Sequence, residues 1–138
     1  MTPFPLKIVT PDGLLFDREA EEILVRTTSG DAAILAGHIN YVAPLGMGRA
    51  VVVSGGNRRT AACIGGMLSV VDGAVTLVPT TFEWAESIDL PRAEASLQRA
   101  DKVLHDKQAS DTDLRLAEAR LRRALVRKSV ASNNLRKL

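Results

Sequence analysis

The spacing of apolar residues changes near Ile88, and this change divides the chain into two parts. Before it, short runs rich in Val and Ile alternate with turn signals such as Asp72-Gly73. After it, Leu and Ala recur every three or four residues, and no glycine occurs up to Val130. The first texture is typical of strands and the second of helices. The sequence therefore predicts an α+β fold, with a β domain over residues 1–87 and a helical domain over residues 88–138.

The β domain is predicted to be an antiparallel sandwich of short strands. Nine runs are candidate strands: Leu6–Thr10, Leu14–Asp17, Glu22–Thr27, Ala32–Ile34, Tyr41–Leu45, Gly48–Val53, Arg58–Ile64, Met67–Val71 and Ala74–Val78. Asp-Gly and Gly-Gly pairs between them supply the positive φ angles that tight hairpin turns need. The single cysteine, Cys63, excludes an intramolecular disulfide and is expected in the core.

The helical domain is predicted to be an antiparallel two-helix hairpin. The apolar stripes are Leu90, Ala93, Leu97, Ala100 and Leu104 on the first helix, and Leu114, Ala117, Leu121, Ala124 and Leu125 on the second. Asp89 is a candidate N-cap before Pro91, and Ser110 or Asp111 can cap the second helix after a polar link. A seam so rich in alanine buries little apolar surface, so the hairpin is expected to be marginally stable and free to dock or extend.

No catalytic or metal-binding constellation is recognisable. His38 and His105 are far apart in sequence, and neither has the companion ligands that a metal site requires. The pairs Gly55-Gly56 and Gly65-Gly66 lack the Lys-Ser/Thr of a phosphate loop. Glu19, Glu21 and Glu22 are interpreted as a solvated strand edge. We therefore expect a non-catalytic protein that requires no cofactor and no metal.

Charge and hydropathy bound the location and the partners. Residues 1–88 carry 6 Lys/Arg and 9 Asp/Glu, whereas residues 89–138 carry 12 and 7. No apolar run approaches the ~18 residues of a membrane span, and the first residues lack a signal-peptide pattern. The expected protein is soluble, cytoplasmic and at most peripheral to a membrane.

The excess of basic residues lies on particular helix faces. Arg92 and Arg99 share a face of the first helix, and Arg120, Arg123 and Arg127 share a face of the second. In a hairpin these faces can converge, and guanidinium groups bind phosphate oxygens in a bidentate way. The alternative is a solvated charged face with helical pairs such as Glu118–Arg122. The spacing alone leaves both interpretations open.

Four motifs occur in an order that matches a known family. They are Val9-Thr10-Pro11-Asp12-Gly13, the Gly-x-x-x-Ile-x-x-Gly-His segment within Ser29–His38, Gly65-Gly66-Met67-Leu68-Ser69-Val70 followed by Gly73–Thr76, and Ile88-Asp89-Leu90-Pro91-Arg92-Ala93. Over nearly its full length the chain resembles the epsilon subunit of bacterial F-type ATP synthase. The resemblance implies a sandwich of about ten strands followed by a helical hairpin.

The resemblance also implies a role in a rotary motor at the cytoplasmic face of the bacterial plasma membrane. Such a subunit binds the gamma subunit and the c-ring, turns with the rotor, and helps couple proton flow to ATP synthesis. Its hairpin can extend toward the alpha and beta subunits and restrain ATP hydrolysis. By the same resemblance, Asp31, Gly37 and His38, in loops at one end of the sandwich, are expected to contact the c-ring and gamma.

In some members of that family the compact hairpin binds ATP as a regulatory ligand. Aligned motif by motif, the site falls on Glu83, Ile88, Asp89, Arg92, Ala93 and Arg99, with Arg123 and Arg127 from the second helix. The second-helix assignment assumes one inserted residue near Asp111, and without that assumption Arg122 is the alternative.

Three rival interpretations remain at this point. The first is a nucleic-acid-binding module, against which acidic residues interleave with the arginines and no aromatic residue follows Trp84 for base stacking. The second is a stand-alone sandwich enzyme, which the missing acid/base constellation disfavours. The third is a coupling and assembly subunit of the same family that binds no ATP.

Overall fold

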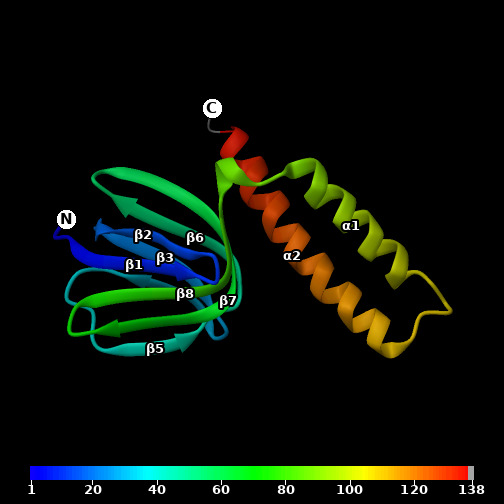
Figure 1. Ribbon diagram of the computed structural model, residues 1–138, viewed down its shortest axis with the longest axis horizontal. Helices are drawn as coiled ribbons and strands as arrows, with labels where there is room; N and C mark the ends of the chain where they lie inside the picture. The colour runs from blue at the N-terminus through cyan, green and yellow to red at the C-terminus, as the bar shows by residue number, and fades with distance from the viewer. Residues whose placement is uncertain (137–138) are drawn as a thin grey trace. The chain divides into compact units, whose positions relative to one another are not determined.

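In a computed structural model of the chain, the backbone is described for residues 1–136 and the side chains for residues 1–133. Over residues 1–136 eight strands precede two helices (Figure 1). The elements are β1 (Phe4–Thr10), β2 (Gly13–Ala20), β3 (Glu22–Thr27), β4 (Gly30–Ile34), β5 (Tyr41–Pro44), β6 (Met47–Ser54), β7 (Asn57–Val71), β8 (Ala74–Trp84), the short 3-10 helix η1 (Ala85–Ser87), α1 (Leu90–Leu104) and α2 (Asp111–Arg136). Two compact units result: Met1–Trp84 and a second that begins at Ala85. The predicted boundary after Ser87 falls at the end of η1 rather than at its start.

The strands of the first unit form one continuous sheet that folds over into a sandwich. Their order is β2-β1-β8-β7-β6-β3-β4, and β5 pairs with β7. Among the described strands the pairs are antiparallel except that of β1 with β8, which is parallel. Two strands joined by a short hairpin must be antiparallel. β1 and β8 are far apart in sequence and not joined in this way, so a parallel pair is allowed.

The predicted strand count was too high because two candidate strands are halves of one. β7 runs through Gly65 and Gly66, whose φ angles are 68° and 105°. Before this bend β7 pairs with β6, and after it with β5. A Cβ on Gly66 would collide with the carbonyl oxygen of Val78, so glycine is needed there for space as well as for φ. The glycine pair therefore bends a strand that changes partners, and eight strands replace the nine candidates and the implied ten.

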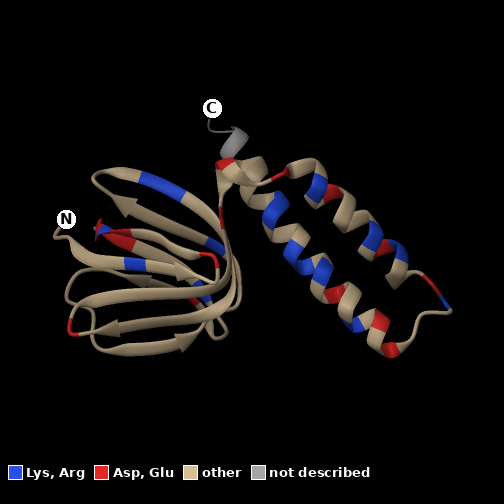
Figure 2. Ribbon diagram, viewed as in Figure 1, with Lys and Arg blue, Asp and Glu red and all other residues tan. Residues whose placement is uncertain are grey.

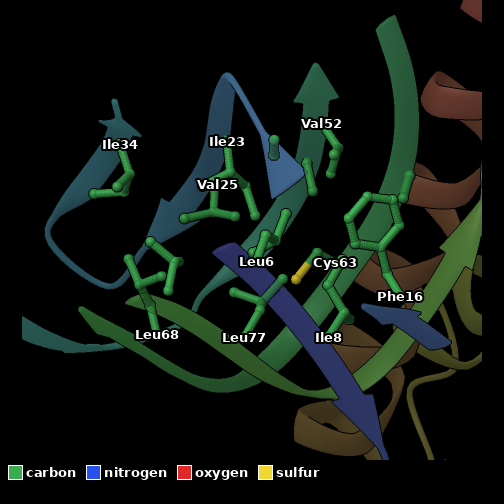
Figure 3. Close-up of a cluster of buried hydrophobic side chains, with 14 of the residues drawn as sticks. Leu6, Ile8, Phe16, Ile23, Val25, Ile34, Val52, Cys63, Leu68 and Leu77 are labelled. Carbon is green, nitrogen blue, oxygen red and sulfur yellow. The ribbon is translucent and has the colours of Figure 1, made fainter. Parts of the chain in front are cut away.

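Large aliphatic side chains from many strands meet inside the sandwich (Figure 3). Leu6, Ile8, Ile23 and Leu68 are each at most 1% exposed. Cys63 lies among them as expected, and burial raises the pKa of its thiol to about 12. Removal of this apolar surface from water is the main stabilising contribution to the first unit.

Both helices of the second unit begin at side-chain caps. The Arg92 N–H donates to Asp89 Oδ1 at 3.1 Å, and Pro91 lies in the first turn of α1. The Asp113 N–H donates to Ser110 Oγ at 3.1 Å, while the Ser110 N–H donates to Asp113 Oδ2 at 3.4 Å. The predicted cap of α1 is confirmed, and Ser110 rather than Asp111 caps α2.

Small residues dominate the buried surface of the hairpin. Among the helical residues whose side chains are described, the buried ones are Ala93, Ala100, Ala117, Ala124, Val130 and Ala131. The predicted stripe was wrong at Leu125, which is 47% exposed. Leu125 follows Ala124 by ~100° around the helix, so once alanine faces α1 the leucine falls at the edge of the contact.

Candidate functional site

One ion pair fixes the alignment of the two helices. Lys128 Nζ of α2 lies 3.6 Å from Glu94 Oε1 of α1. Because the helices are antiparallel, residues beyond Glu94 on α1 lie level with residues before Lys128 on α2. Arg99 comes five residues after Glu94, and Arg123 comes five residues before Lys128. These two arginines therefore lie at about the same height along the hairpin.

Helix geometry also assigns each charged residue to a side of the seam. With ~100° per residue, Arg92 and Arg99 lie on one side of the line from Ala93 to Ala100, and Glu94 lies on the other. On α2, Arg120, Arg123 and Arg127 all lie on the same side of Ala124 around the helix axis. Since the helices run in opposite directions, both groups fall on the same side of the hairpin. We call this the arginine side: Arg92, Arg99, Arg120, Arg123 and Arg127.

Most acidic residues of the two helices lie on the side opposite the arginines. Over α1 and the described part of α2, Glu94, Asp101, Asp111 and Glu118 fall opposite the arginine side, whereas Asp113 in the first turn of α2 falls on it. Arg122 also lies opposite, with Glu118 as its predicted helical partner. Figure 2 shows bands of Lys and Arg along both helices. Between Arg92 and Arg99 on α1, and between Arg120 and Arg127 on α2, the arginine side carries no carboxylate, and clustered guanidinium groups have the chemistry of a phosphate-binding surface.

The arginines differ in exposure. Arg92 and Arg99 are exposed, whereas Arg123 and Arg127 are half-buried. Arg92 and Arg99 stand seven residues apart, which is ~10 Å along the axis. Helix geometry thus puts four predicted site residues on one side of the hairpin and the alternative, Arg122, on the other side.

The remaining predicted residues of the ATP set have other surroundings. Asp89 caps α1 and Ala93 is 4% exposed in the seam, so both are needed by the hairpin itself. Ile88 is half-buried between η1 and α1. Glu83 is half-buried on β8 in the first unit, and its part in a site stays a prediction from the resemblance.

A surface hollow of about 750 Å³ lies on α1. It is lined by Ala95, Gln98, Arg99, Asp101, Lys102 and His105. These residues come from a single helix, so the hollow is open rather than enclosing. Of its lining residues, Arg99 alone belongs to the arginine side. The hollow therefore adds no enclosed ligand cavity.

The expected rotor contacts do not form a single loop cluster. Asp31 lies at the start of β4 rather than in a loop, whereas Gly37, with a φ of 79°, follows the far end of that strand. His38 Nδ1 lies 2.7 Å from the carbonyl oxygen of Ile39. Asp31 is therefore separated from Gly37 and His38 by most of β4, and the contact role of all three residues stays a prediction.

Asp31 is engaged by a neighbouring arginine. Arg26 Nε donates to Asp31 Oδ1 at 2.6 Å, across the β3–β4 pair. This hydrogen bond holds the pKa of the Asp31 carboxyl below its ordinary value, and the charges of Arg26 and Arg49 act in the same direction.

The sequence did not predict the polar cluster formed by Glu21, Gly55 and Gly56. The N–H groups of Gly55 and Gly56 donate to the two carboxylate oxygens of Glu21 at 3.0 and 3.1 Å. Glu21 therefore clamps the β6–β7 turn instead of lying on a solvated edge. The signal was the glycine pair itself, because consecutive N–H groups in such a turn bind anions.

No group of three or more His, Cys, Asp or Glu side chains among the described residues is arranged to hold a metal ion. No helix in the described part of the chain is long and apolar enough to cross a membrane.

Known proteins resemble both units. The family "ATP synthase, Delta/Epsilon chain, beta-sandwich domain" matches residues 3–85, and its "long alpha-helix domain" matches residues 86–132. The ATP synthase epsilon chain of Bacillus velezensis is 44% identical over 96% of this chain and 100% of its own length. That of Ruminococcus albus is 40% identical over 96% and 98%.

A solved structure shares the fold. In the mitochondrial ATP synthase of Euglena gracilis (OSCP/F1/c-ring), one chain aligns with a TM-score of 0.78 at 24% identity. The alignment covers 88% of this chain and 77% of that one. At this identity the likeness concerns the fold alone.

Proposed function

The chain belongs to the ATP synthase delta/epsilon chain family, and from this membership we propose that it is a non-catalytic central-stalk subunit of an F-type ATP synthase. Its first unit binds the gamma subunit and the c-ring, so that the chain turns with the rotor at the cytoplasmic face of the membrane. In that position it helps couple proton flow to ATP synthesis. Full-length similarity to epsilon chains supports this proposal.

The hairpin of this subunit is proposed to bind ATP as a regulatory ligand. The arginine side supports this proposal, because helix geometry puts Arg92, Arg99, Arg123 and Arg127 on one side of the hairpin, and guanidinium groups bind phosphate oxygens. Hydrogen bonds to charged groups contribute ~1.5–3 kcal/mol each. A few of them are comparable to the stability expected of an alanine-seamed hairpin.

Such a ligand acts by shifting an equilibrium. ATP that bridges α1 and α2 binds the compact hairpin and not an extended one, so it favours the compact state. When ATP is scarce, the hairpin extends toward the alpha and beta subunits and restrains ATP hydrolysis. The ligand thereby links the restraint to the ATP supply.

Calorimetry on the isolated chain tests ATP binding. We expect heat of binding with ATP at up to millimolar concentration, and a weaker affinity in Arg92→Ala and Arg123→Ala. Lys102→Ala and Arg122→Ala are matched controls, because these cations lie off the arginine side. Equal affinities in all four variants would show that the arginine side is not the site.

Purification tests the assignment to the rotor. We expect the chain to co-purify with a gamma-type subunit under native conditions. A monomer without a rotor partner would contradict the central-stalk role.

A second candidate is a coupling and assembly subunit that binds no ATP. The structural roles of Asp89 and Ala93 favour it, since the hairpin needs both residues whether or not a ligand binds. Absence of binding heat at millimolar ATP, with intact rotor association, would select this candidate.

A further inference from the structure

Two glycines of the first unit have no conformational reason to be glycine, and both lie near the side chain of Arg26. Of the ten glycines, all within the described chain, eight have positive φ angles that favour glycine. Gly46 and Gly48 do not, so backbone conformation does not explain them. Gly48 lies against Arg26, because a Cβ on Gly48 would lie 2.6 Å from Arg26 Cβ, whereas the atom nearest to a Cβ on Gly46 is the Thr27 carbonyl oxygen at 3.2 Å, with Arg26 Cγ at 3.4 Å.

Arg26 lies across these glycines and reaches Asp31. Its Nε donates to Asp31 Oδ1 at 2.6 Å, and its second amino group approaches Oδ2 at 3.5 Å. The Gly46 N–H donates to the Arg26 carbonyl at 2.9 Å, which ties the backbone of β3 to the same segment. Any side chain at Gly48 would displace the arginine from this position.

The turn between the two partners is also held. Thr27 Oγ1 donates to the Gly30 carbonyl at 2.7 Å and accepts the Ser29 N–H at 3.1 Å. The side chains of Arg26 and Asp31 are 52% and 55% exposed, and exposed ion pairs contribute little to folding. A geometry built so closely for a pair of small energetic value indicates a role in recognition.

We propose that Arg26, accommodated by Gly48, is a positioning residue that holds the ionised Asp31 carboxylate in place for the rotor. The inference rests on the proposed function and on the predicted contact of Asp31 with the rotor. An ionised carboxylate only accepts hydrogen bonds, so the rotor surface that meets Asp31 presents a donor, an amide or a cation. Preorganisation of the acceptor lowers the entropy lost on binding.

Two variants disturb the pair in different ways. Arg26→Gln removes the charge and keeps much of the bulk, whereas Gly48→Ala changes no charge and displaces the arginine. Arg49→Gln removes a neighbouring charge without removing the hydrogen bond, and Arg58→Gln removes an exposed charge elsewhere. Asp31→Asn removes the proposed contact itself.

The first measurement is the titration of the Asp31 carboxyl in the isolated chain by carbon NMR. We expect its pKa to rise toward the ordinary value in Arg26→Gln and Gly48→Ala, to rise less in Arg49→Gln, and to stay unchanged in Arg58→Gln. An unchanged pKa in both Arg26→Gln and Gly48→Ala would overturn the proposal. Arg26→Gln keeps the test decisive if Gly48→Ala does not fold.

The second measurement is affinity for a gamma–c-ring subcomplex. We expect Arg26→Gln, Gly48→Ala and Asp31→Asn each to weaken binding about fivefold, the scale of a well-formed exposed pair. If Asp31→Asn alone weakens binding, the positioning role of Arg26 is wrong while the contact stands. If none of the three does, Asp31 is not a contact and the proposal is overturned. Failure of the unaltered chain to bind would instead contradict the central-stalk function.

Discussion

The interiors of the two units are built from different side chains. The sandwich buries Leu, Ile, Val and Phe from most of its strands, whereas the described part of the hairpin buries mainly alanine. Burying a large aliphatic side chain contributes ~1.5–3 kcal/mol, and alanine has far less apolar surface to contribute. The sandwich is therefore suited to hold a fixed position, and the hairpin to respond to a ligand. Four changes test this difference.

The largest effect is expected in the sandwich core. Leu68→Ala removes a side chain that is 0% exposed, so it should lower the free energy of unfolding of the first unit by ~2–5 kcal/mol. Urea unfolding measures this loss. Leu14→Ala is the control, because Leu14 is 60% exposed and should cost under ~0.5 kcal/mol. Similar costs at both positions would contradict the assigned core.

An intermediate effect is expected in the hairpin seam. Ala100→Leu forces a larger side chain between closely packed helices and should destabilise the hairpin by ~1–3 kcal/mol. Circular dichroism measures the lost helicity. Ala95→Leu, on the exposed face of α1, should be neutral. Increased helicity in Ala100→Leu would show that the helices leave space for a larger side chain at Ala100, and would contradict the close packing.

A smaller effect is expected at the start of α1. Asp89→Ala removes the capping oxygen and should cost ~1 kcal/mol, confined to the second unit. Asp89→Asn retains a capping oxygen and should cost little. Hydrogen exchange of the α1 amides distinguishes the two variants, and equal protection in both would contradict the capping role.

The smallest effect near neutral pH concerns Cys63. Its pKa is raised from 9.0 to about 12 in the folded chain, so the unfolded thiol ionises first. The resulting stability is fully present below pH 9 and is lost as the pH rises from 9 to 12. Cys63→Ala should weaken this part of the pH dependence of sandwich unfolding. An identical alkaline loss in that variant would show that other groups cause it.

Periodicity and capping chemistry predicted the helices well. Asp89 and the start of α1 followed from local rules, because N-caps depend on residues three positions apart. The bend at Gly65 and Gly66 did not, since a glycine pair reads as a turn unless the partner strands are known. Leu125 was misplaced because the contact between helices, not the period, decides which residues at the stripe edge are buried.

The candidate site shows the same limit. The sequence identified the arginine faces of each helix, but it did not decide between Arg122 and Arg123. The alignment of α1 with α2, which the Lys128–Glu94 pair supplies, puts Arg123 on the arginine side and Arg122 off it, and the role of either residue stays a prediction. The accommodation of Arg26 by Gly48 was likewise invisible, because it joins strands that are distant in sequence.

Hydrogen exchange of the whole isolated chain, with and without ATP, tests the central claim most directly. A fixed sandwich and a ligand-responsive hairpin predict strong protection of the β6, β7 and β8 amides in both conditions. They also predict weak protection of the α1 and α2 amides that rises when ATP is added. Helix amides as protected as the sandwich core, and unchanged by millimolar ATP, would contradict the account.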